Sequence, residues 1–282
     1  MTTDDRQLDG FSLQDAGYGP AGQAESIAGN RQWWDSEAAG YYEEHGSFLG
    51  DHELVWGPEG LQESEAHLLG EVEGQDVLEI GCGAAQGARW VASAGGRVVA
   101  TDLSSGMLTQ AHAIDAGSDS PRPVYVQCDA CALPFADGSF DIAFSAYGAV
   151  PFVADSAILM HEVARVLRPG GRWVFSVTHP LRWAFPDSPD VAGLTVHRSY
   201  FDRTPYVERL DSKVVYAEHH RTLADRVAEL LQAGFSLTGV LEPEWPEGNE
   251  RTWGGWSPLR GRLIPGTLIL SAERLESDVH HK

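Results

Sequence analysis

Three small-residue positions and two carboxylates stand at spacings that suit the binding of a nucleoside. Residues 77–87 read Val-Leu-Glu-Ile-Gly-Cys-Gly-Ala-Ala-Gln-Gly, so an apolar run passes through Glu79 into a turn with Gly81 and Gly83. Glycines at the end of a strand let a ligand approach the backbone, and the helix that follows offers free N–H groups. Asp102 ends a second apolar run, about 20 positions further on, where a ribose would be held. The pattern predicts a nucleoside-binding α/β protein.

Glu79 narrows the choice of nucleoside. A pyrophosphate bound beside this carboxylate would meet an added negative charge, whereas a cationic ligand would be favoured. S-adenosyl-L-methionine carries a sulfonium and an ammonium group and no phosphate, so it fits better than a dinucleotide. An alternative stays open, in which Glu79 caps the following helix by accepting from N–H groups of the glycine turn. The two roles are compatible.

Further motifs follow in a recognisable order. Val124-Tyr-Val-Gln-Cys-Asp-Ala leads from a third strand into Asp129 and Ala130, and Leu133-Pro-Phe comes next. A helix then ends in Leu167-Arg-Pro-Gly-Gly. With the glycine turn and Asp102, these motifs resemble the class I S-adenosylmethionine-dependent methyltransferases, in particular the small-molecule branch that contains the quinone-biosynthesis methyltransferases. The resemblance covers residues 74–180 strongly and 216–272 weakly.

The resemblance implies a fold and a cofactor. The fold would be α/β and Rossmann-like, a doubly wound, mostly parallel seven-stranded sheet with helices on both faces and an amino-terminal helical cover. The cofactor would be S-adenosyl-L-methionine. Its expected binding residues are Tyr42, Glu79, Gly81, Gly83, Ala85, Asp102, Leu103, Met107, Asp129, Ala130 and Ser145.

Several of these positions have a second interpretation or depart from the family pattern. Tyr42 would bind the methionine carboxylate, with plain aromatic packing of its helix as the alternative. Met107 would face the adenine, with helix-to-sheet packing as the alternative. Ala85 stands where the family usually has a third glycine. A Cβ there is normally tolerated only at negative φ, so Gly87 would supply the flexibility instead.

Methyl transfer asks little of side chains, because positioning and desolvation supply most of the rate. A hydroxyl acceptor also needs a proton acceptor nearby, and histidine suits that role near neutral pH. His179 follows the fifth strand, at the end of the sheet where ligands bind. His219 and His220 precede a helix beside an insertion. His179 and His220 are the catalytic candidates, and hydrogen bonding within a loop is the alternative for each.

The acceptor site is expected between three segments at the carboxyl ends of the strands. They are the loop after the fourth strand, the insertion at 181–215 and the aromatic loop at 242–266. The expected apolar walls are Tyr147, Phe152, Trp183, Tyr200 and Trp245. The aromatic content favours a hydroxyl oxygen of an aromatic or polyketide-like compound as acceptor, with a carbon or an amine nitrogen left open.

Proline and glycine residues, together with changes in polarity, divide the chain into regions. Residues 1–30 are polar and expected to be a poorly ordered tail, and 31–70 form the helical cofactor cover, with helices at 31–43 and 58–69. The methyltransferase domain would span 71–272, and 273–282 would be a second tail. The insertion 181–215 contains Pro186, Pro189 and Gly193 and is expected to lack regular structure. Long aromatic loops such as 242–266 are usually functional.

Composition excludes several other classes. The formal net charge of −21 and the lack of a basic run argue against a nucleic-acid or membrane-surface partner. No apolar run reaches about 18 residues, which predicts a cytoplasmic protein. A small-molecule acceptor is the expected partner, and the protein is expected to be a monomer or a homodimer. Cys128 and Cys131 have CxxC spacing, but no second pair or histidine pair completes a metal site, so no metal is expected.

Two other functions are weighed. A short-chain nicotinamide oxidoreductase is disfavoured because no Tyr-x-x-x-Lys pair follows the fourth strand. A non-catalytic protein that binds S-adenosylmethionine stays open.

Overall fold

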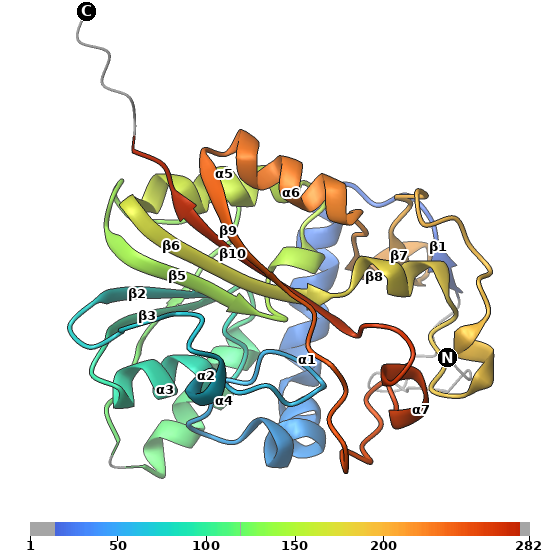
Figure 1. Cartoon of the computed structure of the whole chain (residues 1–282), viewed down its shortest axis with the longest axis horizontal. Coiled ribbons are helices and arrows are strands. Elements are labelled where there is room, and N and C mark those ends of the chain that lie inside the picture. Colours follow the sequence, from blue (N-terminus) through green and yellow to red (C-terminus); the bar gives the residue numbers. More distant parts are fainter. Residues whose placement is uncertain (1–14, 119, 277–282) are drawn as a thin grey trace, which may run out of the picture.

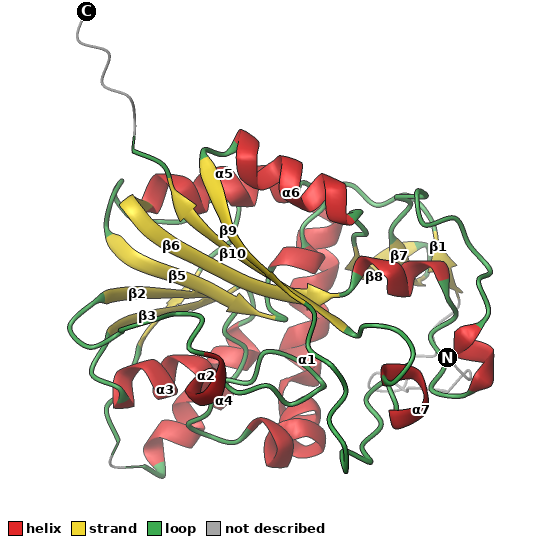
Figure 2. Cartoon of the chain, in the orientation of Figure 1, coloured by secondary structure: helices red, strands yellow, loops and turns green. Residues whose placement is uncertain are grey.

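The computed structural model describes residues 15–118 and 120–276, which form two β-sheets and the helices around them (Figures 1 and 2). The strands of the larger sheet are β2 (Asp76–Ile80), β3 (Arg97–Asp102), β4 (Val124–Gln127), β5 (Phe140–Ala146), β6 (Leu167–Thr178), β9 (Phe235–Leu241) and β10 (Thr267–Arg274). The strands of the smaller sheet are β1 (Asp15–Tyr18), β7 (Tyr206–Leu210) and β8 (Lys213–Glu218).

The larger sheet has the order β4-β3-β2-β5-β6-β10-β9. The first five strands pair in parallel, while β10 lies antiparallel between β6 and β9. The chain order reverses direction between β2 and β5, so the carboxyl ends of these strands flank a topological switch point, where open α/β sheets bind ligands. The predicted doubly wound, mostly parallel seven-stranded sheet is confirmed.

The helices are α1 (Gln23–Leu49), α2 (Glu63–Ala66), α3 (Gln86–Ser93), α4 (Ser105–Ala116), α5 (Ser156–Val166), α6 (Leu223–Gln232) and α7 (Pro258–Gly261). Helices α3, α4, α5 and α6 cover the two faces of this sheet. In Figure 1, α3 and α4 lie below the sheet, α5 and α6 lie above it, and α1 runs across the carboxyl ends of the strands. Two buried apolar clusters, one on each face, fill the space between sheet and helices. Burial of these side chains is the main stabilising contribution to the fold.

Charged side chains explain why the Leu-Pro-Phe and Leu-Arg-Pro-Gly-Gly motifs occur. Arg165 of α5 donates to the carbonyl oxygens of Leu133 (2.8 Å) and Phe135 (2.7 Å) and so holds that turn in place. Arg168 pairs with Asp76 (2.9 Å) and Asp141 (2.6 Å), which lie at the starts of β2 and β5. The motifs therefore fix the amino-terminal edge of the sheet, opposite the ligand-binding edge.

Two segments that were expected to lack regular structure contain helices and strands. Residues 15–30 are not a poorly ordered tail, because β1 pairs with β7 and α1 already begins at Gln23. The insertion 181–215 is not irregular either. It contains the 3₁₀ helices η2 (Pro180–Ala184) and η3 (Val191–Leu194) together with β7 and the start of β8. A third strand from the amino terminus completes this sheet, so local sequence could not reveal it.

The cover also differs in detail from its prediction. The expected helix at 31–43 extends over Gln23–Leu49, and the expected helix at 58–69 shrinks to one turn, Glu63–Ala66. The buried carboxylate of Glu63 accepts from the backbone N–H groups of Leu68 and Leu69 and from the indole of Trp56, which folds this segment into a compact loop. At the other end, β10 extends to Arg274, and residues 277–282 lie outside the described part.

Within the described residues, no helix combines the length and the apolarity needed to cross a membrane. The same residues contain no group of three or more histidine, cysteine and acidic side chains arranged to hold a metal ion.

Candidate active site

The glycine turn between β2 and α3 has the geometry that its sequence requires. Gly81 has φ of +69°, and a Cβ on it would lie 2.3 Å from the backbone nitrogen of Ala149 in the loop after β5. Gly83 has φ of +53°, and a Cβ there would meet no atom within 4 Å. Gly81 therefore lets two backbones pack, while Gly83 borders open space that a ligand can enter.

Asp102 lies beside that open space at the end of β3. Its carboxylate accepts from the backbone N–H groups of Gly83 and Ser104, both at 2.8 Å. The side chain is half-buried, and burial raises its pKa to about 6. A partly accessible carboxylate next to the turn can accept hydrogen bonds from ribose hydroxyls, as the sequence predicted. These residues fit a nucleoside cofactor.

Glu79 caps α3. Its Oε2 accepts from the N–H of Ala88 at 2.8 Å in the first turn of the helix. Glu79 therefore contacts the helix itself and not the N–H groups of the glycine turn that the sequence suggested, since the Gly83 N–H donates to Asp102. Burial raises the pKa of Glu79 to about 8. A Cβ on Gly87 would lie 2.7 Å from the Oε1 of Glu79 and 3.0 Å from Phe144. Gly87 thus provides space for this carboxylate inside α3, which corrects the expectation that it supplies turn flexibility.

Ala85 has the opposite conformation to the one expected. Its φ is +62°, in the left-handed region, and its side chain is fully buried. This conformation costs a non-glycine residue roughly 1–2 kcal/mol. The turn therefore keeps the backbone of a glycine although the residue is alanine. Its N–H donates to the carbonyl oxygen of Cys82 at 2.8 Å, which helps to hold it there.

Sequence reasoning missed Arg89, which holds the glycine turn in place through hydrogen bonds from its buried side chain. This buried guanidinium donates to the carbonyl oxygens of Ala84 (2.5 Å) and Asp51 (2.6 Å) and pairs with Asp115 at 3.2 Å. It joins the glycine turn to the end of α4 and to the segment after α1. A single arginine gives no motif, so only the packing reveals this role.

The cover also reaches the cofactor side through Asp35, another residue that the sequence did not single out. Its Oδ1 accepts from the Ser104 hydroxyl (2.7 Å), the Ser105 hydroxyl (3.2 Å) and the Gly106 N–H (2.8 Å). These groups form the amino terminus of α4, immediately after Asp102. Helix α1 therefore fixes the start of α4, where carboxylates at a helix amino terminus are stabilising.

The other expected cofactor residues lie around this edge with contacts of their own. The Tyr42 hydroxyl donates to Asp51 at 2.5 Å, and the Ser145 hydroxyl donates to the Ile80 carbonyl at 2.7 Å. Asp129 is half-buried and accepts from the Cys131 N–H at 2.9 Å. Met107 and Ala130 are buried, and Leu103 is half-buried. Their roles toward the cofactor remain predictions.

His179 has no free lone pair. Its Nδ1 accepts from the Leu181 N–H at 3.1 Å, and its Nε2 lies 2.8 Å from the Oε1 of Glu242. The proton therefore resides on Nε2 and is donated to the carboxylate, while the lone pair on Nδ1 caps η2. This arrangement suits a residue that positions η2 and the loop at 242–266 rather than one that accepts a proton.

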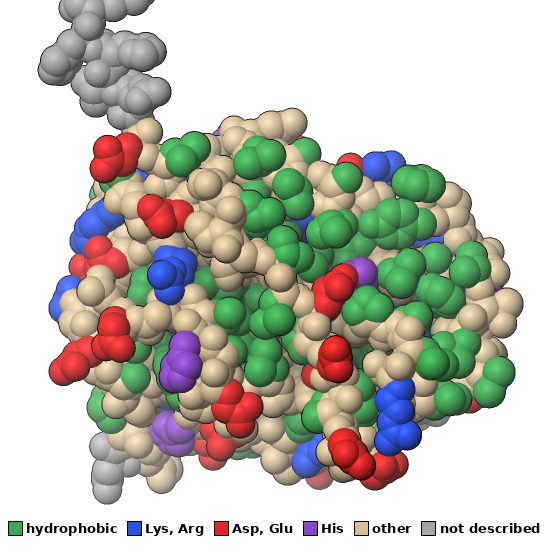
Figure 3. Space-filling model, viewed as in Figure 1, with side chains coloured by type: hydrophobic (Ala, Val, Ile, Leu, Met, Phe, Trp, Pro, Cys, Tyr) green, Lys and Arg blue, Asp and Glu red, His purple; other side chains and the backbone are tan. Residues whose placement is uncertain are grey.

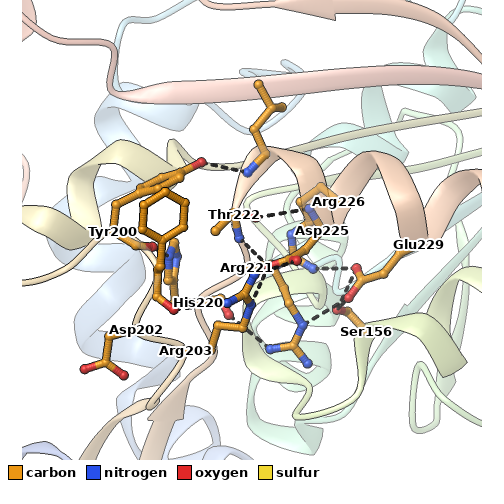
Figure 4. Close-up of polar contacts among 12 residues, drawn as sticks. Ser156, Tyr200, Asp202, Arg203, His220, Arg221, Thr222, Asp225, Arg226 and Glu229 are labelled. Atoms are coloured by element: carbon orange, nitrogen blue, oxygen red, sulfur yellow. Dashed lines mark hydrogen bonds and ion pairs between the residues drawn. The ribbon is translucent and has the colours of Figure 1, made fainter.

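His220 has a different arrangement, seen in Figure 4. Its Nε2 donates to the backbone carbonyl of Tyr200 at 2.7 Å, and its Nδ1 has no hydrogen-bond partner among the described residues. The ring lies against Trp183, with centroids 5.5 Å apart. Burial lowers the pKa of His220 to about 4, so the ring is neutral at physiological pH. Its Nδ1 lone pair is unpaired within the described residues and is buried. His219, by contrast, is bonded to Ser26 at 2.9 Å.

Aromatic rings from distant segments pack against one another between α1, the loop after β5 and the small sheet. Phe152, after β5, lies 5.6 Å from Trp34 of α1 and 5.9 Å from Tyr216 of β8. Tyr216 in turn lies 5.1 Å from Trp33. Trp183 of η2 continues the row, 6.4 Å from Tyr18 of β1. In Figure 3, hydrophobic side chains also gather on the outer surface of this part of the molecule, on the right of the view.

Some expected acceptor residues are placed elsewhere. The Tyr147 hydroxyl bonds to Thr267 at 2.8 Å, and the Tyr200 hydroxyl accepts from the Leu223 N–H at 2.9 Å at the start of α6. Trp245 packs against Gly261 and donates to the Asn249 carbonyl. Trp253 is the residue of that loop which stacks on His45 of α1, at 4.3 Å. The tryptophans of this loop are equivalent in the sequence, so the sequence could not show which of them packs against α1.

The sheet, the glycine turn and Asp102 together define a nucleoside-binding α/β protein. The methyltransferase domain family matches residues 78–175, which include the glycine turn and Asp102. A demethylmenaquinone methyltransferase of Mycolicibacterium vanbaalenii is 42% identical over 199 residues, covering 68% of this chain and 73% of the relative. The chain belongs to the S-adenosylmethionine-dependent methyltransferases, and its cofactor is S-adenosyl-L-methionine.

Other similar proteins agree with this assignment. The crystal structure of an S-adenosylmethionine-dependent methyltransferase from Mesorhizobium loti matches with a TM-score of 0.61 and 32% identity, covering 77% of this chain and all of that one. A malonyl-[acyl-carrier protein] O-methyltransferase of Erwinia billingiae is 39% identical over 104 residues. That match spans 37% of this chain and 39% of the relative, less than half of either.

Proposed function

We propose that this protein transfers the methyl group of S-adenosyl-L-methionine to a small-molecule acceptor, at a hydroxyl oxygen of an aromatic or polyketide-like compound. We infer the chemical class of the acceptor from one observation, the row of aromatic rings formed by Trp33, Trp34, Phe152 and Tyr216. Aromatic walls bind flat apolar ligands and exclude water, which methyl transfer requires. A relative with the printed name O-methyltransferase supports oxygen as the accepting atom.

On the donor side, the proposal gives each residue a role toward the cofactor. Asp102 accepts from the ribose hydroxyls, and Asp129 accepts from the adenine amino group. When bound, S-adenosyl-L-methionine supplies a methyl group activated by its sulfonium. Gly83 leaves room for the cofactor beside the turn. Glu79 is buried beneath the turn, and a bound sulfonium would stabilise its ionised form, whereas a phosphate would not.

On the acceptor side, the proposal assigns proton acceptance to His220 and a positioning role to His179. The support is the free Nδ1 of His220, whose tautomer is fixed by the Tyr200 carbonyl. Its low pKa makes it a weak base, so positioning of the acceptor supplies most of the rate. General-base catalysis typically contributes 10²–10⁴-fold, and the low pKa places this contribution at about 10².

Calorimetry and turnover test these statements separately. S-adenosylhomocysteine should bind at micromolar strength and NAD should not bind, and heat with NAD alone would refute the donor assignment. Turnover is then measured with labelled S-adenosylmethionine and a panel of phenols, quinones and amines. On a phenol that is methylated, His220→Ala should lower turnover by about 10² while cofactor affinity stays within a few-fold.

His179→Ala is the matched variant. It should affect turnover less than His220→Ala, because its lone pair already accepts from Leu181. Full turnover in His220→Ala would show that His220 does not act as a base. Catalysis would then rest on the proximity of donor and acceptor alone. Methylation of amines but not of phenols would contradict the hydroxyl acceptor.

A further inference from the structure

One face of the small sheet carries alternating phenols and carboxylates, of which the proposed methyl transfer uses only the ring of Tyr216. Tyr206 and Glu208 lie on β7, and Tyr216 and Glu218 lie on β8. In the register of the two strands Tyr206 stands opposite Glu218, and Glu208 stands opposite Tyr216. Because side chains two positions apart share a face, all four lie on the same side of the sheet. The two strands thus form a polar face on which Glu208 is buried and the other three side chains are half-buried.

The phenols and carboxylates are bonded to each other along each strand. The Tyr206 hydroxyl donates to Glu208 at 3.0 Å, and the Tyr216 hydroxyl donates to Glu218 through a short hydrogen bond. Tyr216 also belongs to the aromatic row of the acceptor side, through its contacts with Trp33 and Phe152. Its ring therefore joins the apolar walls to the carboxylate of Glu218.

Glu218 retains capacity to bind a further donor. Tyr216 is its only hydrogen-bond donor among the described residues, whereas an ionised carboxylate offers about four acceptor sites. The side chain is half-buried, so part of it stays accessible. Burial nevertheless raises its pKa, which the nearby charge of Arg182 and the Tyr216 hydroxyl oppose.

The nearest cation does not neutralise this carboxylate by direct contact. Arg182 of η2 pairs with Asp187 at 3.1 Å, and its guanidinium lies over the ring of Trp183 at 4.8 Å. Glu218 thus lies near the charge of Arg182, while the ion pair that Arg182 makes among the described residues is with Asp187. The local field favours ligands that bring hydrogen-bond donors or positive charge and disfavours anions.

We infer that Glu218 is the recognition group at the polar end of the acceptor site, and that it selects acceptors with a hydrogen-bond donor, hydroxyl or ammonium, over acceptors that end in a carboxylate. This inference rests on the proposed small-molecule methyl transfer. The apolar part of such an acceptor lies against Phe152 and Tyr216, and its donor group reaches the Oε atoms of Glu218. The donor bound here is a second polar group of the acceptor, distinct from the oxygen that receives the methyl group.

Three probes with one ring system isolate the effect of the polar group. Naphthol, naphthylmethylamine and naphthoate are titrated into the full chain by calorimetry, with and without S-adenosylhomocysteine. The wild type should bind naphthol and naphthylmethylamine at least about tenfold more tightly than naphthoate, because charge-assisted hydrogen bonds are the stronger ones and like charges repel. Glu218→Gln, which keeps the shape of the side chain, should reduce that preference to about threefold or less.

Two further variants separate recognition from structure. Glu247→Gln removes an exposed carboxylate of the loop at 242–266 and should keep the wild-type preference. Tyr216→Phe keeps the ring but removes the internal donor, so the preference for hydroxyl and ammonium probes should widen. If Glu218 had only a structural role, its replacement would not change the relative affinities of the three probes.

The outcomes distinguish this inference from the proposed function. If S-adenosylhomocysteine does not bind, the proposed function fails, and the order of the probes is still measured without it. The inference is overturned if naphthoate binds as well as naphthol, if none of the three probes binds, or if Glu218→Gln keeps the wild-type preference.

Discussion

The donor side and the acceptor side of this molecule are built in different ways. The donor side is assembled from consecutive elements, with Glu79, Gly83, Asp102 and Asp129 at the ends of neighbouring strands β2, β3 and β4. The acceptor side brings together segments that lie far apart. Asn30 of α1, for example, bonds to the backbone of Ala217 across 187 positions of sequence. A donor site of this kind is set by local motifs, whereas the acceptor site depends on long-range packing.

The two sides share one element, which is α1. Its Asp35 holds the start of α4 beside Asp102, while its Asn30 donates to the carbonyl oxygens of Phe152 and Ala217, both at 3.0 Å. Asn30 also accepts from the Ala217 N–H at 2.8 Å. One helix therefore fixes the donor edge through a carboxylate and the acceptor edge through a buried amide. Changes in α1 can be chosen to affect one side or both.

The largest effect should come from deletions at the amino terminus. Removal of residues 1–48 takes away Asp35 and nearly all of α1, so binding of S-adenosylhomocysteine should be lost in calorimetry. Removal of residues 1–22 takes away only β1 and the chain before it, and donor affinity should stay within a few-fold. The described residues 15–28 contain β1 and the first turns of α1, with Ser26 bonded to His219, so a deletion of 1–28 should not be silent. Normal donor binding after removal of 1–48 would show that α1 is no cover.

A reciprocal pair of substitutions should separate the two sides. Asp102→Ala removes two charge-assisted hydrogen bonds to the ribose, worth about 1.5–3 kcal/mol each before losses, and should weaken binding of S-adenosylhomocysteine at least tenfold, about 1.4 kcal/mol. Asn30→Leu leaves buried backbone groups of Phe152 and Ala217 unpaired, at about 1–3 kcal/mol each in stability. It should lower turnover while donor affinity changes little.

Equal effects of both variants on donor affinity would contradict the separation. Urea unfolding of both proteins provides the control, since Asp102→Ala should remain folded. Asp129→Ala should weaken donor binding in the same direction as Asp102→Ala but by less.

The smallest effect should be a pH dependence confined to the donor side. Burial raises the pKa of Asp102 to about 6, and hydrogen bonds from ribose hydroxyls favour its ionised form. Affinity for S-adenosylhomocysteine should therefore be constant above pH 6 and fall below it, by at most about tenfold per pH unit. Asp102→Asn should bind weakly with no such dependence. A wild-type affinity that rises toward pH 5 would show that the protonated carboxyl binds the ligand.

Local sequence was enough to predict the strand, the glycine turn and the position of Asp102 on the proposed donor side, because these features are local. A strand, a glycine turn and a helix follow one another within residues 76–93, and the acidic residue that ends the next strand must lie beside them in a parallel sheet. Hydrophobic runs and breakers likewise predicted the strands of the large sheet. Ala85 was the exception, because the surrounding contacts impose a left-handed φ that an alanine alone would not adopt.

The acceptor side could not be predicted to the same depth, for physical reasons that particular residues make plain. Nothing local to 15–18 indicates a strand, because β1 exists only through its pairing with β7. Nothing local distinguishes Trp253, which stacks on α1, from Trp245, which packs on Gly261. His179 and His220 have the same chemistry in sequence, and only their hydrogen-bond partners show which one keeps a lone pair.

The amino-acid sequence by itself thus determined the family, the sheet, the cofactor and the carboxylates at the strand ends. Periodic burial and glycine turns follow from neighbouring residues, whose preferences persist in any context. The tertiary structure alone decided that a second, three-stranded sheet forms, that Arg89 bonds to the glycine turn and Asp35 to the start of α4, and that the Tyr216 hydroxyl donates to Glu218. Those features arise from side-chain directions and from contacts between distant segments, which only the folded chain specifies.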